Sequence, residues 1–444
     1  AVGLFAPNGI PWIVARLGVL FAGAVAVSLD TDLDTGALDA QLQTSGVRVL
    51  ITAAELDSTV PATGREDLAI WLLDAPPDDS RSLGRLEATA PPLGKLPQPA
   101  PEDTAALFFT SGTTGPPKGV PLTHGNIAGT VEALVSLDLV GPGDRVLLPL
   151  PLHHSYPFIV GLLIPLVLGA TVVLPAGVSA PEIRQGLGEG RVRVVVGVPR
   201  LYTALAEGLS GRRRRGGPGE RIFYLLLRLC TETRARMGLD LGRVLLRPLR
   251  RRLAPALETL ASGGARLDPD AARILEGLGW QVLSGYGLVE TASVATFNPP
   301  GRNRVGSAGL PAPGTRIDLD RSGLDAGGTF GAGEGEVLIK GPGVFPGYLD
   351  RPEANATAFT PAGWFRSGDL GYLDDEGYLW ITGRVTEMIV LPDGKNVAPD
   401  SVEAVYAQSP YIAEIAVLER EGTLVGLVVP EIAALRAAGG TPAD

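Results

Sequence analysis

The stretch of sequence best suited to chemistry runs from residue 110 to residue 119 and spells TSGTTGPPKG. Its glycines let backbone N–H groups approach anionic oxygens closely, its hydroxyl side chains add donors, and Lys118 supplies a cation. The pattern predicts a loop that grips phosphate. In a Walker loop Ser or Thr follows Gly-Lys, whereas here Pro117 precedes and Gly119 follows the lysine. A P-loop kinase or GTPase is therefore disfavoured, and a polar hairpin turn is the alternative.

The loop resembles the signature of the adenylate-forming superfamily, which includes acyl-CoA synthetases, luciferases and peptide-synthetase adenylation domains. Further motifs similar to those of the superfamily occur along nearly the whole chain. They are PLHH at 151–154, GGA at 263–265, YGLVE at 286–290, WFRSGDL at 364–370 and GR at 383–384. Several ordered motifs at family spacing are far more specific than any one of them.

The roles that the resemblance implies suit the chemistry of these residues. Activating a carboxylate with ATP requires a site that spreads phosphate charge, holds Mg²⁺ and fixes the nucleoside. Glu290 is expected to bind Mg²⁺, which prefers hard oxygen ligands, and Asp369 with Arg384 to hold the ribose hydroxyls. His154 is expected either to gate the acyl pocket or to form part of its wall. The expected catalytic residues are Lys118, Thr113, His154 and Glu290. Those expected to bind the nucleotide are Thr110, Ser111, Gly112, Thr113, Thr114, Gly115, Lys118, Gly263, Gly264, Ala265, Tyr286 (stacked on adenine), Gly287, Asp369 and Arg384.

Three positions depart from the family's pattern. Val289 stands where the family usually has a threonine that contacts the α-phosphate, so we expect slower adenylation. Thr386 replaces the Asp or Lys of the family's hinge, and its β-branched side chain is stiffer at χ1. No lysine follows Lys395, although the family's adenylation step uses a lysine near the C-terminus, so either the chain is cut before it or the site is incomplete. Lys395 itself is expected to contact a CoA phosphate or to lie in a solvated turn.

The elements that must position these residues alternate between short apolar strands and helical segments. The segments expected as buried strands are 47–51, 106–110, 193–198 and 281–283. The longest apolar run, 158–174, is interrupted by Pro165 and two glycines. We expect a buried helix followed by a strand there, and not a membrane span, which usually needs about 20 residues.

The fold class expected is α/β, with doubly wound sheets in a large N-terminal region. From about residue 335 the sequence changes to short strands and tight turns, which predicts a small β-barrel-like element. A partial small α/β domain is expected to follow. The expected domains are 1–383, an adenylation domain with an incomplete start, and 384–444, a small domain cut before its catalytic lysine.

Composition and charge exclude several classes of protein. Hydrophobic residues make up 45% of the 444 residues and charged residues 19%, which excludes a largely disordered chain. The net charge of −10 argues against a nucleic-acid partner. One cysteine, Cys230, and three histidines disfavour a thiolate or histidine metal site and favour a reducing, cytoplasmic location. The arginine run 212–215 is expected to be a solvated loop, with contact to an anionic membrane as the alternative.

The substrate is expected to have an uncharged acyl tail. The segments that would form its pocket, FIVGLL, VVVGVP and SGGARL, are apolar or small, and no aspartate suited to binding a substrate amine occurs near Gly285. The insert at about 210–255, and the stretches 262–265 and 389–396, resemble the long-chain fatty acyl-CoA ligase branch.

The leading hypothesis is therefore activation of a fatty acid by ATP, with Mg²⁺, to acyl-AMP and pyrophosphate, followed by transfer to CoA. Activation of another carboxylic acid, or loading of an acyl carrier protein, stays open. A second alternative is a homologue that binds nucleotide and acyl groups with impaired catalysis. Membrane contact is expected to be peripheral at most.

Overall fold

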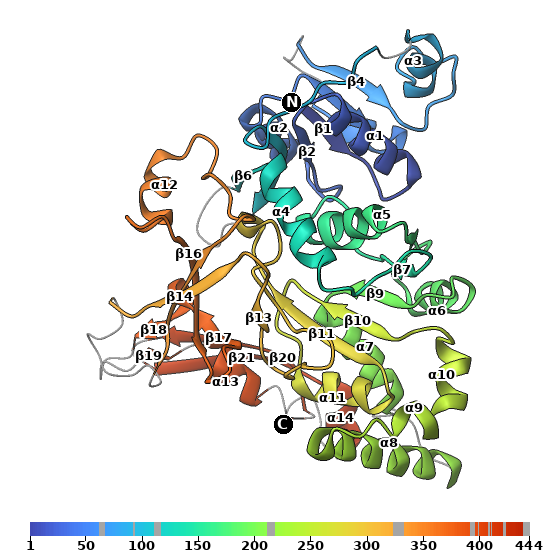
Figure 1. Ribbon diagram of the computed structural model, residues 1–444, viewed down its shortest axis with the longest axis vertical. Helices are drawn as coiled ribbons and strands as arrows, with labels where there is room; N and C mark the ends of the chain where they lie inside the picture. Colours follow the sequence, from blue (N-terminus) through green and yellow to red (C-terminus); the bar gives the residue numbers. More distant parts are fainter. Residues whose placement is uncertain are drawn as a thin grey trace. The chain divides into compact units, whose positions relative to one another are not determined.

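The chain folds into two compact units, Ala1–Thr315 with Gly341–Ala356, and Arg316–Lys340 with Thr357–Asp444. The computed structural model (Figure 1) describes residues 1–61, 67–91, 94–110, 117–210, 218–322, 333–390, 396–397, 399–406, 409, 411–420 and 423–437. The described residues of the first unit contain two large sheets, and those of the second unit contain one four-stranded sheet and two two-stranded sheets, β18-β19 and β20-β21.

The first sheet of the first unit is parallel apart from its last pair of strands. Its strands are β1 (Val2–Phe5), β2 (Ala26–Ser28), β3 (Val49–Thr52), β4 (Ala69–Leu72), β5 (Thr104–Thr110) and β6 (Lys118–Thr123). They are ordered β4-β3-β1-β2-β5-β6, and β6 runs antiparallel to β5. The strands are apolar because both faces are covered, and Leu50 and Val27 pack in one core with Leu38 and Leu42 of a neighbouring helix.

The second sheet has the order β13-β12-β11-β10-β9-β7-β8. Its strands are β7 (Arg145–Leu147), β8 (Thr171–Val173), β9 (Val194–Gly197), β10 (Thr259–Ser262), β11 (Gln281–Tyr286), β12 (Thr296–Phe297) and β13 (Leu310–Pro311). The pairs among β7 to β11 are parallel, and β12 and β13 are antiparallel. The four buried strands expected from the sequence correspond to β3, β5, β9 and β11, so that expectation is confirmed.

Helices cover these sheets (Figure 1). They are α1 (Ile10–Phe21), α2 (Thr35–Thr44), α3 (Leu83–Thr89), α4 (His124–Val135), α5 (Ile164–Val167), α6 (Ala180–Glu189), α7 (Pro199–Ser210), α8 (Pro218–Met237), α9 (Gly242–Leu245), α10 (Arg247–Leu253) and α11 (Pro269–Gly277), with 3₁₀ turns η1 (Ala54–Thr59) and η3 (Val289–Thr291). The apolar run 158–174 forms a π-helix, η2 (Pro157–Leu163), then α5 and β8. A helix followed by a strand is thus confirmed, and no helix in the described part of the chain is long and apolar enough to cross a membrane.

The second unit is built on a four-stranded antiparallel sheet, β14 (Arg316–Asp320), β15 (Gly335–Lys340), β16 (Phe365–Leu373) and β17 (Leu379–Arg384). Three of its strands begin at residue 335 or later, where the sequence predicts a small β-barrel-like element, whereas β14 precedes that residue. The described strands form an open sheet in which β14 and β17 are the two edges. Shorter elements follow: η4 (Val385–Glu387), β18 (Ile389–Val390), β19 (Asn396–Val397), α13 (Pro399–Tyr406), β20 (Ile412–Arg420), β21 (Thr423–Pro430) and α14 (Ile432–Ala437), while α12 (Pro352–Ala358) spans the junction of the units. The predicted domain boundary falls where β17 ends, and the division at that residue stays a prediction.

Candidate active site

The predicted phosphate loop connects two paired strands. In the antiparallel pair β5 and β6, Thr110 lies opposite Lys118, so the two ends of the loop are adjacent. Lys118 is half-buried at the start of β6. Ser111, Gly112, Thr113, Thr114 and Gly115 lie outside the described residues, and their phosphate contacts stay a prediction.

Tyr348 joins the predicted phosphate-binding lysine to the predicted magnesium ligand. Its hydroxyl donates a hydrogen bond of 2.9 Å to Oε1 of Glu290, whose residue is 8% exposed. The Nζ atom of Lys118 lies over the face of the same ring, 4.8 Å from its centroid. One aromatic side chain thereby holds a carboxylate at its edge and an ammonium group on its face.

The phenol of Tyr348 remains a proton donor at neutral pH. Burial raises its pKa well above the usual value, and the negative charge and hydrogen bond of Glu290 raise it further. A protonated phenol therefore donates to one carboxylate oxygen of Glu290 and fixes its position. No sequence motif marks Tyr348, because it is 58 residues from Glu290 and only the fold brings the two together.

Tyr348 is held by its own segment and by its neighbours. Its backbone N–H donates to Oδ1 of Asn355 (2.7 Å), and Nδ2 of Asn355 donates back to its carbonyl (2.9 Å). The ring of Phe345 packs edge-on against it with 4.9 Å between centroids. The Phe345 N–H donates to the Glu290 carbonyl (2.8 Å), and the Leu349 N–H to the Gly119 carbonyl (2.9 Å). The same short segment therefore contacts both the lysine strand and the glutamate turn.

A strained turn follows Glu290. Ala292 and Ser293 have φ angles of 47° and 76°, a left-handed conformation that non-glycine residues rarely adopt. Buried Ser293 donates a hydrogen bond of 2.7 Å to Oγ of buried Ser155, and this contact fixes the turn. A Cβ atom at Gly287 would lie 2.3 Å from the Ser293 carbonyl oxygen, so only glycine fits there. Gly287, expected to bind nucleotide, is thus required by the turn itself.

An apolar pocket opens beside this turn in the first unit. Its space, with the open solvent at its mouth included, amounts to about 750 Å³, and strands β7 and β9 to β12 line it together with α4, η2 and α5. Among the described residues that line it, the polar side chains carry only hydroxyl groups and none is charged. The apolar lining includes Leu134, Val160, Val196, Leu283, Val294 and Phe297. Such a pocket suits an uncharged, apolar group.

The glycine turn 263–265 forms one wall of the pocket. A Cβ atom at Gly263 would lie 2.8 Å from Cζ of Tyr156, so glycine allows the tyrosine ring to pack against the backbone. The Tyr156 hydroxyl donates to the Ala261 carbonyl (3.2 Å), and burial raises its pKa. Gly264 has a φ of 86°, and Ala265 is exposed. The contact of this turn with adenine stays a prediction, as does stacking by the half-buried Tyr286 at the end of β11.

Two adjacent histidines precede the π-helix. The rings of His153 and His154 are 4.2 Å apart between centroids. Burial, and then the charge of His154, lower the pKa of His153 to about 4. Nε2 of His153 is 3.6 Å from Oδ1 of Asp30, too far for a hydrogen bond, so this carboxylate offsets the burial only partly. His154 is exposed, yet nearby protein atoms desolvate its ring enough to lower its pKa as well. Both rings are therefore neutral at pH 7.

The second unit contains the other two predicted nucleotide ligands. Asp369 on β16 lies opposite Arg384 on β17, and Nε of Arg384 is 3.1 Å from Oδ1 of Asp369. The Asp369 side chain is 6% exposed and that of Arg384 is 46% exposed. The sequence prediction that these two residues act together is consistent with this pair, while ribose binding stays a prediction.

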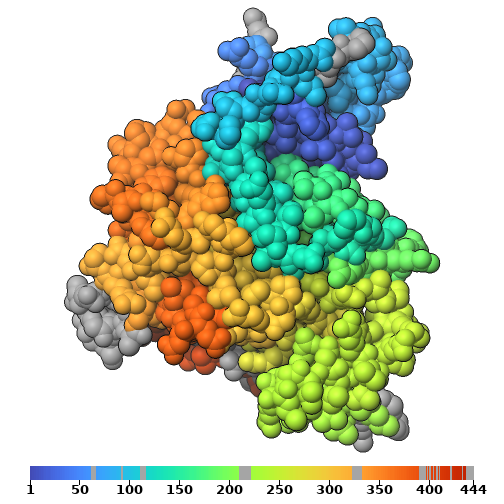
Figure 2. All heavy atoms as spheres, viewed as in Figure 1, coloured from blue at the N-terminus to red at the C-terminus, as the bar shows by residue number. Residues whose placement is uncertain are grey.

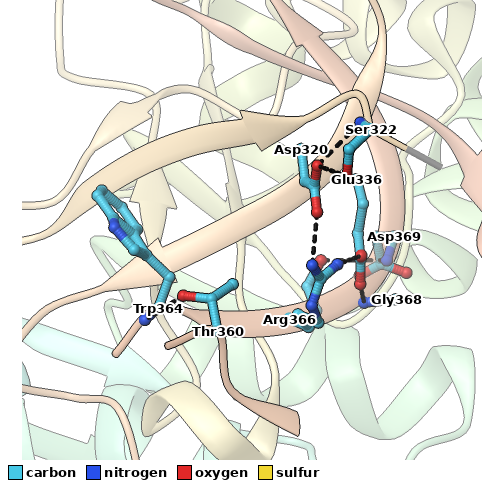
Figure 3. Close-up of polar contacts among 9 residues, drawn as sticks. Asp320, Ser322, Glu336, Thr360, Trp364, Arg366, Gly368 and Asp369 are labelled. Carbon is cyan, nitrogen blue, oxygen red and sulfur yellow. Dashed lines mark hydrogen bonds and ion pairs between the residues drawn. The ribbon is translucent and has the colours of Figure 1, made fainter. Parts of the chain in front are cut away.

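Arg366 anchors the segment that leads to Asp369 (Figure 3). Its guanidinium donates to Oδ2 of Asp320 (2.5 Å) on β14 and to Glu336 on β15. Oε1 of Glu336 also accepts the N–H of Gly368 (3.2 Å), whose φ of 73° favours glycine. Hydrogen bonds from Ser322 and then from Arg366 lower the pKa of Asp320 to about 2. The predicted hinge residue Thr386 lies exposed in η4, and Lys395 lies outside the described residues.

The chain is similar to known enzymes over most of its length. The family model described as AMP-binding enzyme matches residues 1–349. The sulfoacetate–CoA ligase of Cupriavidus necator is 32% identical over 422 residues, which cover 94% of this chain and 74% of that protein. The long-chain-fatty-acid–CoA ligase FadD15 of Mycobacterium bovis is 30% identical over 455 residues, covering 96% and 72%. A solved structure of o-succinylbenzoate coenzyme A synthetase from Bacillus subtilis, in complex with ATP and magnesium, matches with a TM-score of 0.74 and 25% identity, covering 97% and 79%.

Proposed function

Because the chain belongs to the AMP-binding enzyme family, we propose that it activates a carboxylic acid with an apolar tail, a medium- or long-chain fatty acid, and transfers the acyl group to CoA. The resemblance to the adenylate-forming superfamily is confirmed. Adenylate-forming CoA ligases use ATP with Mg²⁺, and CoA, which confirms the predicted cofactors. The observation that carries the choice of acid is the apolar pocket of the first unit.

The reaction has two half-reactions. In the first, a carboxylate oxygen attacks the α-phosphorus of ATP, the bond to the β-phosphate bridging oxygen breaks, and pyrophosphate leaves. In the second, the CoA sulfur attacks the acyl carbon and AMP leaves with the electrons of the broken bond. Both steps build negative charge on phosphate oxygens, so fixed cations and hydrogen-bond donors lower their barriers.

The residues of the first unit suit the phosphate end of ATP. Lys118 supplies a cation beside the loop, and Glu290 supplies hard oxygen ligands that fit Mg²⁺. When bound, Mg²⁺ would neutralise part of the phosphate charge. Tyr348 orients the Glu290 carboxylate through its hydroxyl and contacts Lys118 through its ring. In the second unit, Asp369 would accept hydrogen bonds from the ribose hydroxyls and Arg384 would donate to them.

The lining of the pocket favours the fatty acid of one relative's name over the sulfoacetate of the other's. A sulfoacetate tail ends in a sulfonate, and burying that anion without a cationic partner is strongly unfavourable. Since no described lining residue is charged, the pocket favours an alkyl chain over an anionic tail. Each buried methylene contributes about 0.8 kcal/mol, so affinity rises about four-fold per methylene until the chain fills the pocket.

A single-turnover assay of pyrophosphate release tests the proposal. We expect acyl-AMP to form with decanoate and dodecanoate and not with sulfoacetate at the same concentration. The variant Val160→Arg places a cation on the pocket wall, and it should lose activity with the fatty acids. Leu166→Arg is the matched control, because Leu166 is 43% exposed and outside the pocket lining. Turnover of sulfoacetate in preference to the fatty acids would refute the choice of acid.

A further inference from the structure

One end of the first unit combines exposed apolar side chains with a local surplus of positive charge. Residues 222–252 contain eight arginines and two acidic residues, a net charge of +6 in a chain whose net charge is −10. These residues belong to α8, α9 and α10, with α9 in contact with the other two. Figures 1 and 2 show them together, in yellow-green, at the end of the unit opposite the first sheet.

Helix α8 is apolar on two opposite sides. Its inner side buries Leu227 and Cys230, which are 5% and 1% exposed, in the core of the second sheet. Its outer side presents Ile222, Leu225 and Leu229, which are 59%, 70% and 48% exposed. The spacing i, i+3 and i+7 puts these three side chains in one stripe. A helix that packs on one side normally has a polar second side, so this stripe indicates a second contact.

Arginines also lie on α8 and on α10, the two helices that α9 contacts. On α8 itself, Arg228 is paired with Glu232 at 2.9 Å, while Arg236 lies one turn further along. On α10, the exposed side chains of Arg247, Arg251 and Arg252 have no ion-pair partner in the described part of the chain. Val244 on α9 is 72% exposed between these two helices. The guanidinium groups of the three α10 arginines are therefore available for external anions.

We propose that the outward surface of α8, α9 and α10, defined by residues 222–252, docks on an anionic lipid bilayer. Apolar side chains would enter the region between the headgroups and the acyl chains, while the arginines bind lipid phosphates. The aliphatic part of each arginine side chain can lie along the apolar boundary with its charge at the headgroups. The bilayer contact is interfacial, since no helix in the described ranges could span a membrane.

Charge complementarity favours an anionic bilayer over a second copy of the chain as the partner of this surface. Two copies joined through the same surface would bring the exposed arginines of one copy, Arg247, Arg251 and Arg252, against those of the other. A second exposed apolar face, on α1, provides the contrast: Ile10, Val14 and Phe21 are 73%, 63% and 62% exposed, but the arginine of that helix, Arg16, is buried. The α1 face therefore lacks the charge that would draw it to anionic lipid.

Vesicle co-sedimentation of the full chain tests the proposal. We expect binding to vesicles of equal phosphatidylcholine and phosphatidylglycerol, much weaker binding to phosphatidylcholine alone, and a decrease as salt is raised. The triple variant Arg247→Gln, Arg251→Gln, Arg252→Gln should bind the mixed vesicles at least about 10-fold more weakly, since each arginine near such a surface contributes about 1 kcal/mol.

A second triple variant, Ile222→Ser, Leu225→Ser, Leu229→Ser, should also weaken vesicle binding. Its matched control, Ile10→Ser, Val14→Ser, Phe21→Ser, removes three equally exposed apolar side chains from α1 and should bind as the wild type does. If the serine variant of α8 fails to fold, vesicle binding by the arginine variant still tests the proposal. Absence of vesicle binding, equal loss in the α1 control, or binding to soluble polyglutamate but not to vesicles would overturn the proposal, the last result assigning the surface to an acidic protein.

Discussion

Tyr348 shows at the scale of one residue how an aromatic side chain can serve two opposite charges. Its hydroxyl donates to Glu290 and its ring lies under Lys118, so one side chain contacts both charged groups. The predicted roles of these two groups, binding Mg²⁺ and binding phosphate, would both depend on how Tyr348 positions them. Removing the Tyr348 hydroxyl would remove the contact with Glu290 and keep the contact of the ring with Lys118.

We predict that Tyr348→Phe lowers the rate of acyl-AMP formation 10- to 100-fold and raises the Mg²⁺ concentration needed for half the maximal rate. A hydrogen bond to a charged group contributes about 1.5–3 kcal/mol, and the phenyl ring keeps the contact with Lys118. Pyrophosphate release over a Mg²⁺ titration measures both effects. Tyr372→Phe is the control, because that ring stacks on Trp380 in the second unit. An unchanged Mg²⁺ dependence would contradict the positioning role.

Val289 directly precedes the predicted metal ligand and is half-buried in η3. A valine can neither donate to nor accept from a phosphate oxygen, whereas a threonine of similar volume can do both. We predict that Val289→Thr increases the single-turnover rate of acyl-AMP formation about 10-fold, equivalent to about 1.4 kcal/mol. Val289→Ile, which adds no hydroxyl, should leave the rate nearly unchanged. Equal rates for the threonine variant and the wild type would show that this side chain does not reach the phosphate.

His153 makes the stability of the first unit sensitive to acid. Its pKa is about 4 in the folded chain, below the ordinary value of 6.5, so the unfolded chain takes up a proton first as the pH falls. This destabilisation of the folded state is absent at pH 7, appears below pH 6.5 and is complete near pH 4. Between pH 7 and pH 5 the loss is about 2 kcal/mol. Urea unfolding at both pH values should show a smaller loss for His153→Asn, and equal losses would refute the assignment.

At the scale of elements, glycines decide how closely the strands and turns of the site approach one another. Gly263 ends the strand that forms one pocket wall, and its missing Cβ makes room for the Tyr156 ring. We predict that Gly263→Ala destabilises the chain by about 1–3 kcal/mol and weakens acyl-adenylate binding, because the ring must move into the pocket. Gly18→Ala on α1 is the control: nothing lies within 4 Å of its added Cβ, so it should be neutral or stabilising. Thermal unfolding should show a lower melting temperature for Gly263→Ala and an unchanged or higher one for Gly18→Ala.

The sequence predicts most elements of the site, because their patterns are local. Apolar runs mark the buried strands. The predicted phosphate loop rests on its glycines, its hydroxyl residues and Lys118, and its phosphate contacts stay a prediction. The π-helical geometry of η2 has no such signal, since its backbone widening depends on packing. The contact between Tyr348 and Glu290, like the anchoring of Arg366 by Asp320 and Glu336, joins residues distant in sequence, and only the fold establishes it.

At the scale of the whole molecule, charge is distributed unevenly. Residues 222–252 carry +6, so the remainder of the chain carries −16. The arginine run 212–215, for which the sequence alone leaves a solvated loop or membrane contact open, precedes the same basic segment. A ligase for apolar acids would gain from a surface that binds anionic bilayers, because its substrates partition into lipid. The two proposals remain separable, since vesicle binding requires neither ATP nor an acid.

Calorimetric titration of the chain with acyl-sulfamoyl adenosines of graded chain length tests whether the site binds an apolar acyl-adenylate. These compounds mimic the acyl-adenylate without needing the catalytic lysine that the family carries near its C-terminus. We predict that affinity rises about four-fold per methylene, reaches an optimum, and exceeds that for the sulfoacetyl analogue at least about 100-fold. Equal or tighter binding of the sulfoacetyl analogue, or no dependence on chain length, would contradict activation of an apolar acid.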